Sequence, residues 1–554
     1  MKKLLTILFL LTFIQVKSQI PAWEWARCPT GGGVGSGWEE SYSIASDHSG
    51  NVYLSGFFND TSLIIGSYTF SSVGNNDILI AKYDSSGNVI WATSVGGIGV
   101  DECNSITVDD SENIYVTGEF NSATISFGTY SLTNSGVGTN IFIAKYDSSG
   151  TVVWAKSGKG TGTNLSKSVT VDSWGNSYIT GYYNSPILIF DADTLTKTGA
   201  GFTDAFIVKY NPTGNILWTK NIGDTLAEFS SCIVANNSGD IYITGSFSSP
   251  TLSFDTISVS NVGSSAMFLA KLDSFGNAIW AKSFNSIGNN ETFFVTADAF
   301  GNSYLTGRFI SPILVFASDT LHNTGMYDCF FTKFNSAGNI LWAKSSVGSG
   351  NDFGSSIVVD SIGNSYLAGG FYSPTLTFDT IVLQFPANGF DPMFIVKYDS
   401  SGNTLWGKAI ASGGDDQNSI ALGLNGSIYV GGDFYNVNPF ILGCDTLIRT
   451  ASEVLFVAKL GRNLCPDSTT RVNEINQNIS ETIFPNPFSD NLNVTVNENE
   501  QSQIILYDIL SRKLLQQTFT NSTTLNTEQL ANGIYIYELR TMNGVIKKGK
   551  IIKQ

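Results

Sequence analysis

The chain has 554 residues, only 14% of them charged, and its net charge is −16 at pH 7. Lys and Arg do not cluster except in a short stretch at the C-terminus, which excludes a general nucleic-acid binder, because neutralising phosphates requires such clusters. Average soluble proteins are roughly 25% charged. Here Ser, Thr, Asn and Gly replace the Glu and Lys of helical surfaces, so the composition predicts strands and turns.

Residues 1–18 have the pattern of a signal peptide. Lys2 and Lys3 precede an apolar run that continues to Ile14, and a short polar exit ends at Ser18. The run is too short to span a bilayer, and no later stretch is long and apolar enough to do so. We therefore expect an exported protein without a transmembrane segment.

The six cysteines allow fifteen disulfide connectivities in an exported protein, and the sequence does not choose among them. None forms a CxxC pair, and they do not recur at one position of the repeats described below. A chain of this length can bury a core without disulfides, so we expect buried free thiols. The residues are Cys28, Cys103, Cys232, Cys329, Cys444 and Cys465.

Two motifs recur in fixed order at intervals of about 63 residues. The first, GNxYhTGxF with h apolar, contains Tyr53, Tyr115, Tyr178, Tyr242, Tyr304, Tyr366 and Tyr429. The second, FhAKYDSSGNhhWAK, contains Lys82, Lys145, Lys209, Lys271, Lys333, Lys397 and Lys459. Each of the seven repeats contains short alternating stretches separated by Gly-Asn turns, which predicts four strands, as in one blade of a β-propeller.

The seventh repeat has no tryptophan strand after Lys459, but the start of the chain supplies one. Trp25-Ala26-Arg27 matches the Trp-Ala-Lys of the other repeats. An N-terminal strand in this place would complete the last blade and hide its edge. We therefore predict an all-β, seven-bladed β-propeller over residues 19–463, closed by the N-terminal strand. We interpret the repeated tryptophans as packing between blades.

The blocks "VDSWGNSYITGYY", "FIAKYDSSGTVVWAKS" and "DSIGNSYLAGGF" resemble SBBP repeats, which are bacterial seven-bladed β-propeller repeats. The resemblance covers residues 19–463. It implies the fold and no single activity.

Residues 480–554 resemble the C-terminal sorting domain of type IX secretion substrates in Bacteroidota. The matching residues are Phe484, Pro485, Asn486, Pro487, Tyr507, Asp508, Gly533, Tyr535 and Lys550. Ser511 departs from the family, which often has Gly there. The resemblance implies a small C-terminal β-sandwich that the type IX machinery reads in the outer membrane, and a secreted or cell-surface protein. Residues 464–479, which are polar and show little periodicity, are the predicted linker.

An acidic or amide residue stands fourteen positions before each motif tyrosine: Glu39, Asp101, Asn164, Glu228, Asn290, Asp352 and Asp415. These positions fall on the loops between blades and therefore on one face of the ring. They could form a ligand- or cation-binding rim at the channel mouth. We favour a role in holding the blade junctions, because such side chains bond loop backbone and the position recurs in every blade.

No catalytic, cofactor or metal motif stands out. His48 and His322 lack a neighbouring GxSxG or HExxH motif, and each D-S-S-G-N turn offers one Asp where a calcium loop needs several. We therefore predict a binding or scaffold module, without enzymatic activity or a cofactor, for an unknown protein or glycan ligand. Two alternatives stay open: a propeller glycoside hydrolase or polysaccharide lyase that uses carboxylates, and a structural adhesion component.

Overall fold

The structure is a computed structural model. It describes residues 20–30, 37–134, 138–199, 202–285, 287–386, 392–411, 418–423, 426–435, 439–448, 451–461, 481–484, 488–496, 501–508, 512–541 and 544–553. Within these ranges every regular element is a strand, so the all-β prediction is confirmed. No helix that could cross a membrane is found there. The predicted signal peptide (1–18) and linker (464–479) lie outside the described residues.

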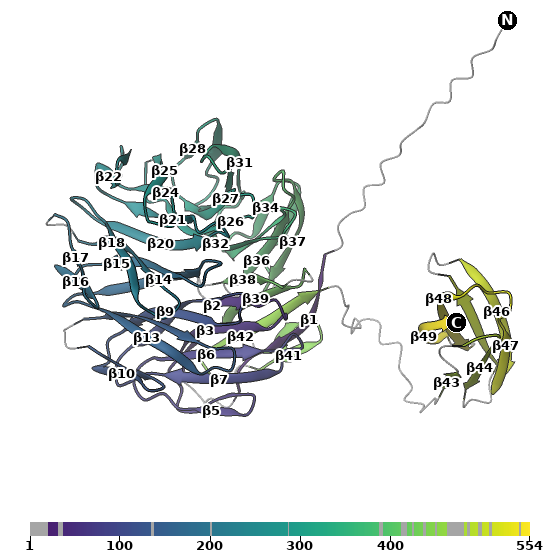
Figure 1. The fold of residues 1–554 in the computed structure, drawn as a ribbon. Helices are drawn as coiled ribbons and strands as arrows, with labels where there is room; N and C mark the ends of the chain where they lie inside the picture. The colour runs from purple at the N-terminus through teal and green to yellow at the C-terminus, as the bar shows by residue number, and fades with distance from the viewer. Residues whose placement is uncertain are drawn as a thin grey trace, which may run out of the picture. The chain divides into compact units, whose positions relative to one another are not determined.

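The chain divides into two compact units, Met1–Asp467 and Ser468–Gln554 (Figure 1). In the first unit, seven sets of four strands pair among the described residues, and we number these sheets 1 to 7. Their first strands are β2 (Glu39–Ser46), β8 (Asp101–Val108), β14 (Asn164–Val171), β20 (Glu228–Ala235), β26 (Glu291–Ala297), β32 (Asp352–Val359) and β38 (Ser419–Leu422). Their second strands are β3 (Val52–Phe58), β9 (Ile114–Phe120), β15 (Ser177–Tyr183), β21 (Ile241–Phe247), β27 (Ser303–Phe309), β33 (Ser365–Phe371) and β39 (Ile428–Tyr435).

In each sheet the third strand carries the lysine of the repeat, and the fourth strand carries the tryptophan. The third strands are β6 (Asp77–Tyr83), β12 (Asn140–Tyr146), β18 (Asp204–Tyr210), β24 (Ala266–Leu272), β30 (Asp328–Phe334), β36 (Met393–Tyr398) and β42 (Glu453–Gly461). The fourth strands are β7 (Val89–Val95), β13 (Val152–Lys159), β19 (Ile216–Ile222), β25 (Ala278–Asn285), β31 (Ile340–Ser345), β37 (Thr404–Ile410) and, in sheet 7, β1 (Ala22–Arg27).

A short hairpin follows the second strand of every sheet. The hairpins are β4 (Leu63–Ile65) with β5 (Tyr68–Phe70), β10 (Thr124–Phe127) with β11 (Tyr130–Thr133), β16 (Ile187–Phe190) with β17 (Asp193–Thr196), β22 (Thr251–Phe254) with β23 (Ile257–Ser260), β28 (Ile313–Phe316) with β29 (Asp319–His322), β34 (Thr375–Phe378) with β35 (Ile381–Gln384), and β40 (Phe440–Leu442) with β41 (Asp445–Leu447). Hairpin β16–β17 also pairs with β13 of the preceding sheet.

The sheets follow one another in chain order around a common centre. Each first strand contacts the first strand of the next sheet, from β2 through β8, β14, β20, β26 and β32 to β38, and β38 contacts β2 in turn. The first strands therefore surround the axis, and the fourth strands lie outside (Figure 1).

The recurrent tyrosine, lysine and tryptophan form a row across each sheet. In sheet 2, Lys145 is paired with Tyr115 on one side and with Trp154 on the other. The Lys145 ammonium lies 4.9 Å from the centroid of the Tyr115 ring, a cation–π contact. The Trp154 indole N–H donates to the carbonyl of Pro212 in the next sheet at 3.1 Å. The tryptophans thus dock on the turns of neighbouring sheets.

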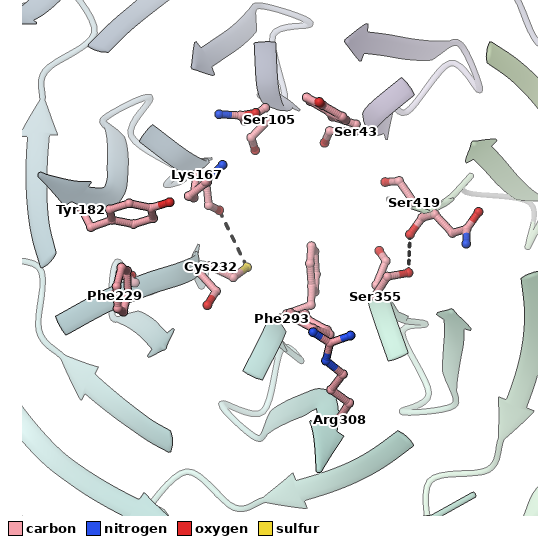
Figure 2. A pocket seen from close by; sticks show the side chains of 18 residues that line it. Ser43, Ser105, Lys167, Tyr182, Phe229, Cys232, Phe293, Arg308, Ser355 and Ser419 are labelled. Carbon is pink, nitrogen blue, oxygen red and sulfur yellow. Dashed lines mark hydrogen bonds between the residues drawn. The ribbon is translucent and has the colours of Figure 1, made fainter. Parts of the chain in front are cut away.

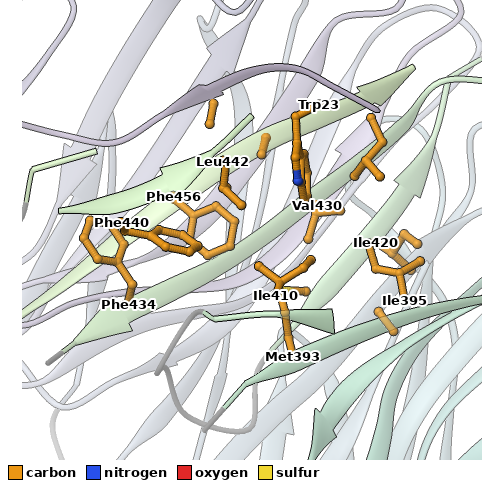
Figure 3. Packing of buried hydrophobic residues seen from close by; sticks show 14 of the residues in the cluster. Trp23, Met393, Ile395, Ile410, Ile420, Val430, Phe434, Phe440, Leu442 and Phe456 are labelled. Atoms are coloured by element: carbon orange, nitrogen blue, oxygen red, sulfur yellow. The ribbon is translucent and has the colours of Figure 1, made fainter. Parts of the chain in front are cut away.

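Sheet 7 takes its fourth strand from the start of the chain. β1 pairs antiparallel with β42, which brings Trp25 opposite Lys459. The Trp25 indole N–H donates to the carbonyl of Ser85 in sheet 1 at 3.0 Å. A Cβ at Gly87, which has φ 81°, would lie 2.8 Å from the Trp25 ring, so the close approach requires glycine. Trp23 belongs to the apolar cluster that joins sheets 6 and 7 (Figure 3).

The second unit contains two antiparallel sheets. One sheet has the strand order β43 (Glu481–Phe484), β44 (Asn491–Val496), β47 (Ser522–Asn526). The other has the order β46 (Lys513–Thr520), β45 (Gln501–Tyr507), β48 (Gly533–Thr541), β49 (Gly544–Lys553). Side chains from both sheets, among them Leu492 and Leu506, form one apolar cluster. The unit therefore has a core of its own.

Candidate functional site

A β-bulge interrupts the first strand of sheets 1 to 6. In sheet 1, the pairing with β3 passes from Ser41 to Ser43 and skips Tyr42. A bulge bends the strand locally and re-aims the side chain of the extra residue. The residues skipped in this way are Tyr42, Asn104, Lys167, Ser231, Phe293 and Ser355. All six are half-buried.

These bulge residues line a cavity of about 350 Å³ at the centre of the first strands (Figure 2). Asn418, just before β38, lines it in sheet 7. The position is occupied by a different type of residue in most sheets, whereas the tyrosine, lysine and tryptophan of the frame repeat. The bulges therefore bring side chains of different types to the cavity, although the four-stranded sheets around it repeat the same tyrosine, lysine and tryptophan.

One side of the cavity is aromatic and cationic. The rings of Tyr182 and Phe229 meet edge to face with centroids 4.9 Å apart. The Arg308 guanidinium lies 5.4 Å from the centroid of Phe293 and forms an ion pair with Glu291 at 2.7 Å. Aromatic faces of this kind accept apolar ligand surfaces and cations.

The other side consists of hydroxyl and amide groups, and part of it is used to join the sheets. The N–H of Ile106 donates to Ser43 Oγ at 3.3 Å, and the N–H of Ile44 donates to Ser419 Oγ at 3.1 Å. The second of these bonds links sheet 7 to sheet 1. Ser105, Ser168 and Ser356 accept equivalent bonds. These serines join neighbouring sheets. Of the bulge residues beside them, Asn104 and Ser355 also donate hydrogen bonds within the protein.

A carboxyl pair lies next to the cavity lining. Glu102 and Glu119 are directly opposite each other on β8 and β9, and Asn104 donates a hydrogen bond to Glu119. Burial raises the pKa of Glu119 to about 7, an effect that the charge of Lys167 partly offsets and that Glu102 increases. Glu119 therefore exchanges its proton near neutral pH.

The predicted rim residues do not lie on the loops between blades, as expected from the sequence: five of the six that are described begin the first strand of their sheet, and Asn290 directly precedes β26. All six that are described are buried. Five bond the serine that follows the second strand of the same sheet, at 2.6–2.8 Å: Asp101 with Ser122, Asn164 with Ser185, Glu228 with Ser249, Asn290 with Ser311, and Asp352 with Ser373. None of these six lines the cavity, and Asp415 lies outside the described residues. A ligand rim at these positions stays a prediction.

Glu39 differs from the other rim residues because sheet 1 has Asp60 where the others have serine. No hydrogen-bond donor among the described residues reaches either Glu39 side-chain oxygen. Burial raises the pKa of Glu39 well above its ordinary value, and the neighbouring Asp60 adds to the effect. Glu39 lies at the seam between sheets 7 and 1, close to the backbone of Leu455.

We expect E39Q to stabilise the protein increasingly as pH rises. Below about pH 4.5 the carboxyl is protonated in both states. Above that pH the unfolded chain loses the proton that the folded chain retains, so the wild type loses stability until pH passes the raised pKa. Gln avoids this loss, and melting temperatures from pH 5 to 8 should show E39Q gaining about 2–4 °C by pH 8. The exposed D110N is the control. A difference that does not grow with pH would contradict the assignment.

Neither a disulfide nor a metal cluster is found where the chain is described. Cys103, Cys232 and Cys329 are buried with free thiols, and Cys465 lies outside the described residues. No group of three or more His, Cys, Asp or Glu residues within those ranges is arranged to hold a metal ion.

The bulge residues were not among the residues predicted from the sequence. When the seven repeats are aligned, these residues occupy one variable position that is followed in most repeats by a serine. The residues at this position are Tyr42, Asn104, Lys167, Ser231, Phe293, Ser355 and Asn418. Aligning the repeats exposes this position, but only the bulge explains why its side chains face the axis.

The sorting motif of the second unit is described in part. Tyr507 ends β45 and donates to Glu538 at 3.3 Å, and the Asp508 carboxylate accepts from the Arg512 N–H at 2.9 Å. Gly533 begins β48, and Tyr535 donates to the carbonyl of Ala531 at 2.6 Å. Phe484 ends β43 and Lys550 lies in β49, their side chains outside the described part. Pro485, Asn486 and Pro487 are not described.

Repeated four-stranded sheets are typical of β-propeller repeats, and family models match one stretch of the first unit and most of the second. Residues 90–122 match the SBBP family, described as a beta-propeller repeat. Residues 482–554 match the secretion system C-terminal sorting domain. The chain therefore carries an SBBP repeat and a type IX sorting domain, which indicates a secreted or cell-surface protein that interacts with the type IX machinery.

Individual relatives are distant. An uncharacterized WD repeat-containing protein of Acanthamoeba polyphaga mimivirus is 26% identical in an alignment of 412 residues that covers 61% of this chain and only 30% of that protein. A fungal alcohol oxidase in complex with copper is 10% identical, with a TM-score of 0.37, over 97% of this chain and 100% of the oxidase. A europium-containing methanol dehydrogenase is 10% identical, with a TM-score of 0.29, over 78% of this chain and 93% of that chain. These similarities transfer no activity.

Proposed function

We propose that residues 19–463 form a closed seven-bladed β-propeller and that residues 480–554 form a β-sandwich, with a signal peptide at 1–18 and a linker at 464–479. The contact of β38 with β2 and the pairing of β1 with β42 support closure. The single core shared by two sheets supports the sandwich.

We infer that the propeller is a binding or scaffold module for a protein or glycan outside the cell, and not an enzyme. The observation that supports this proposal is that the residue type at the bulge position varies from sheet to sheet. The tyrosine, lysine and tryptophan of the sheets and most of the serines in the cavity lining recur from sheet to sheet, but the bulge residues that line the cavity do not. A position that only builds the ring has no reason to vary, whereas a ligand that lacks sevenfold symmetry requires different contacts from each sheet.

Two other functions have some support. A propeller glycoside hydrolase or polysaccharide lyase is favoured by the Glu102–Glu119 pair, since a carboxyl with a pKa near 7 suits a general acid. A structural adhesion component differs from the main proposal only in its partner. If wild type released reducing sugar or unsaturated uronide from a polysaccharide, and E119Q did not, the chain would be an enzyme.

We expect F293A to weaken ligand capture by at least about tenfold, because it removes an aromatic face from the cavity. The measurement is a glycan array and a surface-protein capture with the purified secreted protein, followed by titration of the strongest ligand. F275A is the matched control, since Phe275 is a 78%-exposed phenylalanine on a turn. Equal affinities for wild type and F293A, with both folded, would place the binding surface elsewhere.

A further inference from the structure

The lining of the central cavity is cationic in a chain whose net charge is −16. It contains Lys167 and Arg308 and, among the described residues, no carboxylate. The charge of Arg308 is already matched by Glu291 at 2.7 Å. Lys167 has a nearby carboxyl, Glu119, on which its charge acts, but burial raises the pKa of Glu119 to about 7, so that carboxyl is only partly ionised near neutral pH. Because a half-buried ammonium is stabilised by an anion, the cavity favours a negatively charged group beside Lys167.

The surroundings of Lys167 suit a sugar ring. Lys167 and Tyr182 lie next to each other in the cavity lining (Figure 2). Burial raises the pKa of Tyr182, and the charge of Lys167 partly offsets that rise. Phe229 packs against Tyr182 at 4.9 Å and extends the aromatic face. Asn104 on β8, Ser355 on β32 and Asn418 just before β38 line the same cavity. Asn104 and Ser355 already donate hydrogen bonds within the protein, so they offer a ligand their side-chain oxygens. Aromatic faces stack on the C–H face of a sugar, and amides bond its hydroxyls.

We propose that the cavity binds a carboxylated sugar, such as a uronic acid at the end of an acidic glycan, with its carboxylate on Lys167 and its ring against Tyr182 and Phe229. This inference rests on the proposed binding function and names its ligand class. The cavity volume of about 350 Å³ lies at the small end of ligand pockets, which suits a terminal sugar rather than a continuous chain.

The test compares each acidic sugar with a neutral form of the same shape. Oligomers of glucuronate, galacturonate and mannuronate, and their methyl esters, are titrated against the full-length secreted protein by calorimetry. Wild type should bind one acid at least about tenfold more tightly than its ester. K167M, which keeps the apolar stem but not the charge, should bind the acid and the ester equally and retain the affinity for the ester. K156M removes a lysine outside the cavity, paired with Asp191, and should behave as wild type.

The outcomes separate the inference from the function on which it rests. If wild type binds acid and ester equally, or if K167M keeps the preference for the acid, the acidic-sugar assignment is wrong. If no uronate binds but F293A still weakens capture of a protein or a neutral glycan, the inference fails and the binding module stands. If the wild type captures neither a protein nor a glycan, both fail.

Discussion

Replacing Trp25 with alanine is expected to lower the free energy of unfolding by about 3–5 kcal/mol, which is the usual cost of truncating a buried tryptophan. Trp25 is 5% exposed, donates to Ser85 and packs over Gly87, so the change removes contacts between sheets 7 and 1. The loss falls at the junction of two segments at opposite ends of the propeller sequence, β1 and β42. Denaturant unfolding with a cooperative probe measures it.

Two control variants make this result specific to the closing strand. Trp154 occupies the same place inside sheet 2, and W154A should cost about as much as W25A. Trp174 is 59% exposed, and W174A should cost about 1 kcal/mol or less. Deleting residues 19–28 should have a larger effect than W25A, because it leaves β42 with an unpaired edge and promotes association. If W25A were neutral while W154A was costly, β1 would not be part of the ring.

Deleting residues 480–554 is expected to abolish release to the medium and the cell surface, and to leave the propeller inside the cell envelope. The second unit has its own core, so its removal takes away the sorting domain without opening the propeller. Fractionation and immunoblotting should show at least a tenfold loss of the exported protein, with the retained protein still folded.

The reciprocal experiment controls for misfolding. Residues 464–554 fused to a periplasmic reporter should bring that reporter to the surface or the medium, and the reporter alone should remain in the periplasm. E39Q, which alters the propeller seam only, should be exported normally. Normal export of the truncated chain would contradict the role of the sorting domain.

The repeated four-stranded sheets could be predicted from the sequence because their key residues recur. Tyr115, Lys145 and Trp154 recur with near-constant spacing, and their cross-strand row follows from two-residue strand periodicity. Trp25 could be assigned to the last sheet because it supplied the one element that the seventh repeat lacked. The acidic and amide residues at the start of the first strands were also found, since they recur at one position, although the sequence placed them on loops.

The residues that line the cavity could not be predicted in the same way. A bulge is one extra residue in a strand, and the residues skipped at Tyr42 or Lys167 show no local signature in the sequence. The Glu39–Asp60 contact depends on two residues brought together across a hairpin, and only folding reveals that neither has a serine partner. The Glu102–Glu119 pair likewise depends on register. Repetition in the sequence predicts the residues that the sheets have in common, whereas the proposed binding depends on the bulge residues, which differ from sheet to sheet.

The most direct test is a structure of the secreted protein with the tightest ligand that the arrays and titrations identify. The ligand should occupy the central cavity in contact with Phe293, and an acidic sugar should place its carboxylate within hydrogen-bonding distance of Lys167 Nζ. A ligand seated on the outer hairpins or on the exposed turn residues, with the cavity empty, would contradict the account.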